Sequence, residues 1–144
     1  MAIVPARRFS SVGRAMAVVA AIFMGFLHTT SGQQVDPRRD PASALTDAVR
    51  LLERKDYAAF IRTSISPGDL DGAVKKFGSF DNVVLELSRS GRFPMILMAF
   101  QAALKTAPTF NPEGTRANYA FDVPIDGERR LQLRKVGDLW YWAD

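Results

Sequence analysis

The last twelve residues of the chain, 133–144, read LRKVGDLWYWAD and contain both of its tryptophans. Apolar side chains alternate on both sides of Gly137-Asp138, which predicts two antiparallel strands joined by a two-residue hairpin loop. This loop fixes the cross-strand pairs as Val136 with Leu139, Lys135 with Trp140, and Leu133 with Trp142. We therefore expect both indole rings on one face of the sheet, together with the leucines of the preceding strand.

A second turn, IDGE at residues 125–128, leaves two registers for the strand before it. A two-residue loop places Asp122 opposite Leu131, whereas a three-residue loop over 126–128 places Val123 there. Because a slip of one residue moves every side chain to the other face, the apolar pattern favours the three-residue loop. The predicted pairs are Val123 with Leu131, Phe121 with Leu133, and Tyr119 with Lys135.

The three predicted strands share one apolar face. That face consists of Tyr119, Phe121, Val123, Leu131, Leu133, Trp140 and Trp142. The opposite face carries Arg130, Gln132 and Arg134. A fourth strand around residues 109–111 is restricted to the edge of the sheet, because prolines flank it on both sides.

Five helical segments precede the strands, and most of them carry a start or end signal. The start signals are Asp40, Asp56 and Ser66, whose side chains can accept hydrogen bonds from free backbone N–H groups. The end signals are Gly78 and Gly91, since glycine tolerates the positive φ that helix ends require.

The segment 92–105 differs from the other helices because it is apolar nearly all round. Such a helix is usually buried at the centre of a domain. Helices followed by strands with one apolar face predict an α+β fold. In this fold the N-terminal helices pack on one face of a C-terminal curved antiparallel sheet of three to four strands.

The first 32 residues have the pattern of a signal peptide. Three arginines precede an apolar run over 15–27, and the small residues Thr30 and Gly32 follow it. The run is shorter than the ~20 residues that a membrane span needs. We therefore predict a cleaved signal peptide over 1–32, a flexible tail over 33–40 and a single domain over 41–144. The destination is the periplasm, the cell envelope or the medium.

Composition excludes several kinds of site and partner for the exported domain. The only histidine, His28, lies in the predicted signal peptide, and the chain contains no cysteine. Ser-His-Asp and Cys-His nucleophilic sites are therefore excluded, as are zinc sites built from Cys or His. Three of the 19 basic residues lie in the signal peptide, which leaves 16 against 15 acidic residues. We predict no cofactor, no nucleic-acid partner and no stable membrane span after cleavage.

The C-terminal hairpin and the order of the elements resemble the nuclear transport factor 2-like superfamily, also called SnoaL-like or ketosteroid-isomerase-like. The resemblance covers residues 41–144 and depends on helices followed by a curved sheet that ends in LRKVGDLWYWAD. It implies a cone-like fold whose mouth holds an apolar ligand or an active site. Enzymes of this superfamily use Asp, His and Tyr in the cone. The lack of a histidine after residue 32 favours the fold without that enzymology.

The aromatic face has two interpretations, a core beneath the helices or the floor of a ligand pocket. The candidate ligand-binding residues are Met98, Phe100, Tyr119, Phe121, Trp140 and Trp142. The leading hypothesis is an exported non-enzymatic domain that binds an apolar small molecule or a protein partner through an aromatic-lined cone.

Two other functions are left open by the sequence. One is an enzyme that transfers protons with carboxylate and tyrosine side chains, for which the candidates are Tyr57, Tyr119, Asp81 and Asp122. The other is a cell-envelope assembly protein that pairs through its sheet, for example as a homodimer. Exposed apolar area on Val136, Leu139 and Tyr141 would support this second alternative.

Overall fold

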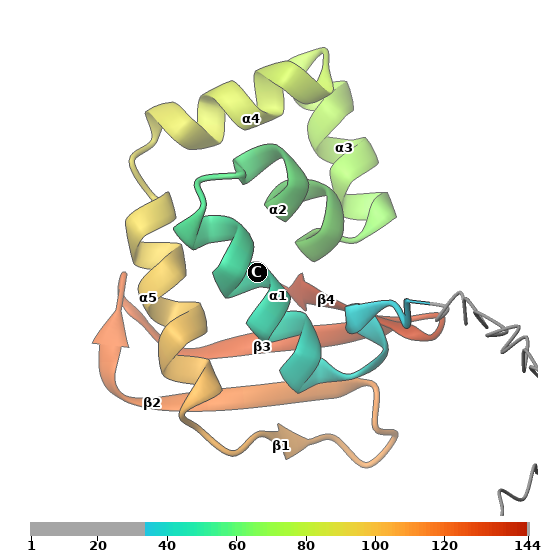
Figure 1. Ribbon diagram of the computed structural model, residues 1–144, viewed down its shortest axis with the longest axis vertical. Coiled ribbons are helices and arrows are strands. Elements are labelled where there is room, and N and C mark those ends of the chain that lie inside the picture. Colours follow the sequence, from blue (N-terminus) through green and yellow to red (C-terminus); the bar gives the residue numbers. More distant parts are fainter. Residues whose placement is uncertain (1–33, 144) are drawn as a thin grey trace, which may run out of the picture. The chain divides into compact units, whose positions relative to one another are not determined.

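The computed structural model describes residues 34–143, and the predicted signal peptide over 1–32 lies outside this range. Five α-helices precede a four-stranded antiparallel sheet in the described residues (Figure 1). The helices are α1 (Pro41–Glu53), α2 (Tyr57–Ser64), α3 (Pro67–Phe77), α4 (Phe80–Arg89) and α5 (Phe93–Leu104). The strands are β1 (Thr109–Phe110), β2 (Arg116–Ile125), β3 (Glu128–Val136) and β4 (Leu139–Ala143). The predicted α+β fold is confirmed.

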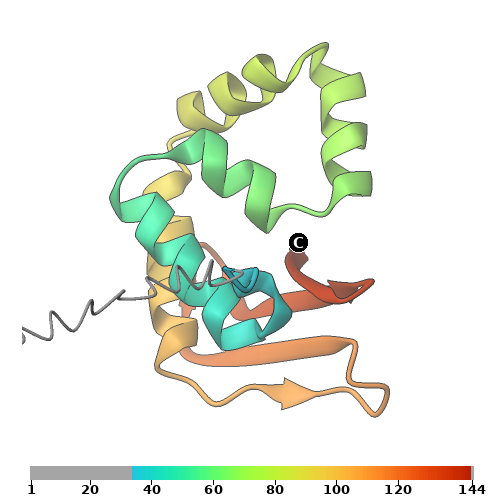
Figure 2. The same cartoon turned by 45° about the vertical axis from the view of Figure 1, so that its right-hand side comes forward.

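The helices cover one face of the sheet (Figure 1). α1 packs on α5, while α5 crosses β2 and β3, and α2 contacts β4. α3 and α4 pack on each other and on α2, and they lie farther from the sheet, as the turned view in Figure 2 shows. The strands are neighbours in chain order, β1-β2-β3-β4. The sheet is therefore a simple meander with β1 and β4 at its edges.

The main core lies between the inner face of the sheet and helices α1, α2 and α5. Its most completely buried large side chains are Leu45, Phe60, Ile61, Phe100 and Leu133. Trp142 packs against Phe60 and Phe100, with ring centroids 6.3 and 5.8 Å apart. Trp140 is also buried and contacts Phe110 of β1. The expected position of both indoles, beneath the helices, is confirmed.

The helix boundaries follow the predicted capping signals. Asp40, Asp56 and Ser66 each accept a hydrogen bond from the backbone N–H three residues on, at 2.8, 3.1 and 3.3 Å. Gly78 ends α3 with a φ of 89°, a conformation that side chains bearing a Cβ rarely adopt. These local signals place the starts of α1, α2 and α3 and the end of α3, because each satisfies backbone groups that the helix itself leaves free.

The apolar helix α5 is buried on one face only. Phe93, Ile96 and Phe100 point into the core, but Met98 and Leu104 are 52% and 41% exposed. The prediction of a centrally buried helix therefore holds for the sheet-facing side and is wrong for the opposite side. The remaining helices do not extend over that side of α5.

Part of the predicted flexible tail, residues 33–40, is instead a short 3-10 helix, η1 (Pro37–Arg39). The Arg38 guanidinium donates to the Asp36 carboxylate at 2.6 Å and lies 5.4 Å from the centre of the Tyr141 ring on β4. The hydrogen bond from Arg38 lowers the pKa of Asp36 to about 2. The segment is ordered by contact with β4, which a polar sequence without periodicity does not reveal.

The β3-β4 hairpin has the predicted register. Leu133 lies opposite Trp142, Lys135 opposite Trp140, and Val136 opposite Leu139 across the Gly137-Asp138 loop. The positive φ of Gly137, 61°, suits the tight loop that joins two twisted strands.

The predicted register of β2 and β3 is wrong. The loop contains two residues, Asp126 and Gly127, both with positive φ, rather than three. A bulge between Ala120 and Ile125 then shifts the pairing, so that Tyr119 rather than Val123 lies opposite Leu131.

The bulge explains why the choice between two regular registers failed. It keeps Tyr119 and Phe121 on the helix-covered face, as predicted, but leaves Val123 71% exposed. Pro124 lies within the bulge, and proline cannot donate a hydrogen bond to a neighbouring strand. The proline therefore favours a bulge, which allows the two-residue turn while Tyr119 and Phe121 stay on the helix-covered face.

Candidate functional site

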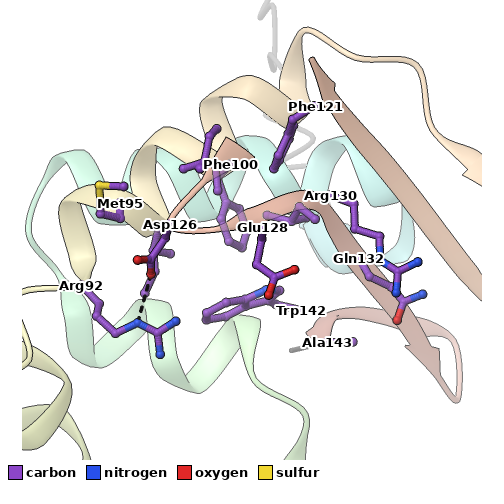
Figure 3. A pocket seen from close by; sticks show the side chains of 14 residues that line it. Arg92, Met95, Phe100, Phe121, Asp126, Glu128, Arg130, Gln132, Trp142 and Ala143 are labelled. Carbon is purple, nitrogen blue, oxygen red and sulfur yellow. Dashed lines mark hydrogen bonds and ion pairs between the residues drawn. The ribbon is translucent and has the colours of Figure 1, made fainter. Parts of the chain in front are cut away.

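A solvent-open cleft of about 180 Å³ lies between α5 and the ends of β3 and β4 (Figure 3). Its floor is apolar and consists chiefly of Ile96, Phe100, Phe121, Leu131 and Trp142. Its rim is polar and consists of Arg92, Asp126, Glu128, Arg130 and Gln132. The volume is slightly larger than the ~150 Å³ of an engineered protein cavity that binds benzene.

The cleft forms because β4 is shorter than β3. The last pair between these strands is Gln132 with Ala143, so residues 128–131 have no β4 neighbour within the described range. The N–H of Lys135 donates to the C=O of Thr115, the residue before β2, at 2.8 Å. Because the backbone groups of successive residues in a strand point to opposite sides, those of the even-numbered β3 residues point to the β4 side. The N–H and C=O of Arg130 therefore face the cleft and add backbone hydrogen-bonding groups to its wall.

The charges on the rim are distributed unevenly. Arg92 and Asp126 form an ion pair at 3.4 Å that joins the start of α5 to the β2-β3 turn. Both side chains are about half exposed, so the pair contributes at most about 1 kcal/mol to stability. Glu128 and Arg130 have no ion-pair partner among residues 34–143. Glu128 points into the cleft above Trp142, whereas the Arg130 guanidinium lies beside Gln132 (Figure 3).

No protein-family model matches this chain, and no curated protein or solved structure is significantly similar to it. The resemblance to the nuclear transport factor 2-like superfamily therefore stays a prediction.

Three of the six predicted ligand-binding residues line the cleft, namely Phe100, Phe121 and Trp142. Met98 is 52% exposed and lies outside the cleft, whose lining includes Met95 instead. Trp140 borders a separate cavity of about 10 Å³, which is about the size of one water molecule. The sixth, Tyr119, is buried in the core, away from both cavities.

The sequence prediction missed the charged half of the site. The sequence predicts Asp126 and Glu128 to lie in the turn and Arg92 to lie at the start of an apolar helix. A signal was present, because the IDGE turn places two carboxylates beside an apolar strand. Without the position of α5 relative to that turn, nothing distinguished these residues from ordinary surface charges.

None of the four candidates for a proton-transfer enzyme lines the cleft. Tyr57 stacks on Phe93 with ring centroids 3.9 Å apart, while Asp81 and Asp122 are exposed on α4 and β2. Tyr119 is buried in the core. These residues therefore do not converge on one another or on the cleft.

The three apolar residues that would support assembly through the sheet differ in their exposure. Tyr141 is only 6% exposed because Arg38 covers it, and Leu139 is half-buried. Val136 is 42% exposed.

Within residues 34–143, no helix has the length and apolarity to cross a membrane. In the same range, no three His, Cys, Asp or Glu side chains are grouped for metal binding.

The hydroxyl of Tyr119 is an unusual polar group in this core. It is buried and has no hydrogen-bond partner in the described part of the chain. Burial raises the pKa of this phenol, and the Asp40 carboxylate adds to the effect. A buried hydroxyl without a partner destabilises the folded state because it has lost its hydration.

We expect Tyr119→Phe to raise the free energy of unfolding by about 1 kcal/mol, since the substitution removes this hydroxyl and keeps the ring. Urea denaturation of both proteins measures the difference. Tyr141→Phe is the matched control, because it removes a hydroxyl that accepts a hydrogen bond from Arg38 and should give no gain. A loss of stability in Tyr119→Phe would show that its hydroxyl is hydrogen-bonded in solution.

Proposed function

We propose that this domain binds a small molecule with an apolar ring in the cleft between α5 and β3, and that it acts as a binding protein rather than an enzyme. The observation that supports the proposal is the aromatic floor formed by Phe100, Phe121 and Trp142. Ligand sites typically combine an apolar lining with a few polar groups that orient the ligand, and this cleft has both.

One sequence feature supports a location outside the cytoplasm in this proposal. The pattern of residues 1–32 is that of a signal peptide. A cone-like fold of the nuclear transport factor 2-like type is part of the same proposal, because such folds hold apolar ligands at the mouth of the cone.

The proposal can be tested with a protein that has a single indole at the site. Trp140→Phe leaves Trp142 as the one tryptophan of the chain. Titration with 2-phenylethanol, a neutral compound with one ring, should change the Trp142 fluorescence saturably. We expect a dissociation constant in about the millimolar range or tighter, because so small a ligand offers few contacts.

Two phenylalanine substitutions on α5 show whether the response comes from the cleft. Ala99→Phe fills the cleft from its lining and should abolish binding. Met98→Phe adds the same ring at the neighbouring, exposed position outside the cleft and should leave binding unchanged. The proposal is wrong if the titration gives no saturable response, or if both variants respond alike.

A further inference from the structure

Glu128 places a carboxylate in the cleft itself (Figure 3). The other acidic residue of the rim, Asp126, is already paired with Arg92. Glu128 has no ion-pair partner among residues 34–143, so its charge is available to a ligand. Glu128 is exposed, so water screens part of its attraction for a cation, and the aromatic floor beside it must supply the rest of the selectivity.

Trp142 adds a second group that attracts positive charge. Its ring packs against Phe60 and Phe100 within the core, yet the side chain is only half-buried and also lines the cleft. The Glu128 side chain points toward this ring (Figure 3). The face of an indole is the aromatic surface that cations prefer. A ligand cation between the two side chains would interact with both.

The positive charges of the rim do not occupy this position. Arg92 is held by Asp126, and the Arg130 guanidinium lies at the other end of the cleft, beside Gln132 (Figure 3). We infer that the ligand of this cleft is a small aromatic or aliphatic amine, whose protonated nitrogen lies between Glu128 and the Trp142 ring. This inference depends on the proposed function, because it names the chemical class of the ligand for the same cleft.

Three compounds with the same phenylethyl group separate the inference from the proposed function. They are 2-phenylethylamine, which is protonated at pH 7, 2-phenylethanol, which is neutral, and 3-phenylpropanoate, which is anionic. We expect the amine to bind about tenfold more tightly than the alcohol, from one partly exposed ion pair and one cation–π contact. Titration of Trp142 fluorescence in the Trp140→Phe protein, checked by calorimetry, gives the three affinities.

Glu128→Gln tests the residue that carries the inference. The substitution keeps the shape of the side chain and removes its charge, so the preference for the amine should disappear while the affinity for the alcohol changes less than about twofold. Asp122→Asn is the control, because it removes a carboxylate that is exposed on β2 outside the cleft, and it should retain the preference for the amine.

The possible results lead to different conclusions. If none of the three compounds binds, the proposed function is wrong, and the inference is wrong with it. If the alcohol or the anion binds as tightly as the amine, the inference alone is wrong. Retention of the amine preference in Glu128→Gln, or its loss in Asp122→Asn, would also overturn it, because the charge that selects the ligand would then lie elsewhere.

Discussion

Replacement of Phe100 by alanine is expected to lower the free energy of unfolding by about 3–5 kcal/mol. The ring is 1% exposed and makes edge-to-face contacts with Phe60 at 5.6 Å and Trp142 at 5.8 Å. It therefore joins α5 to α2 and β4, and its removal leaves a cavity where these elements meet. Domains of this size are stable by only about 5–15 kcal/mol, so the loss is a large part of the total.

Urea denaturation followed by far-ultraviolet circular dichroism measures this loss. Met98→Ala is the matched control, because Met98 lies two residues away on α5 and is 52% exposed. Its replacement should change stability by no more than about 0.5 kcal/mol, as surface substitutions usually do. Equal effects of the two substitutions would show that Phe100 is not the centre of the core.

The features predicted correctly from the sequence are those that depend on local chemistry. The caps at Asp40, Asp56 and Ser66 satisfy backbone groups within three residues, so neighbouring sequence is enough to identify them. The Gly137-Asp138 loop likewise fixes the pairing of both tryptophans with β3. Together with the apolar face of the strands, these signals predict the α+β arrangement.

The features predicted wrongly are one local irregularity and one contact between distant segments. Choosing between two regular registers for β2 omitted a bulge, although Pro124 indicated an interruption. The order of residues 37–39 depends on the contact of Arg38 with Tyr141, more than a hundred residues away in the chain. Neither the bulge nor the contact of Arg38 with Tyr141 produces a periodic pattern in the sequence.

The candidate site was predicted in part for the same reason. Phe100, Phe121 and Trp142 belong to apolar faces that the sequence identifies, and the structure brings them together. The prediction of Met98 is wrong and Met95 lines the cleft instead, because the sequence of an all-round apolar helix does not indicate which side faces the sheet. The charged rim depends on where β4 ends relative to α5, which is a tertiary property.

A disulfide across β2 and β3 has the second large expected effect, and it tests the register with the bulge. Asn118 lies opposite Gln132, and the Gln132 amide donates to the Asn118 side chain at 2.8 Å. The chain has no cysteine, so Asn118→Cys with Gln132→Cys introduces a single pair of thiols. We expect them to oxidise readily, because directly opposed residues without backbone hydrogen bonds between them have Cα atoms ~4.5 Å apart.

The cross-link should raise the free energy of unfolding by about 2–3 kcal/mol relative to the reduced protein, since it closes a loop of about 15 residues in the unfolded chain. Mass spectrometry and urea denaturation, each with and without reductant, measure formation and stability. The control is Asp122→Cys with Gln132→Cys, which would form a disulfide only in the regular register with a three-residue loop. Ready oxidation of the control pair, with free thiols in the first pair, would show that β2 runs without the bulge and that Val123 rather than Tyr119 packs against Leu131.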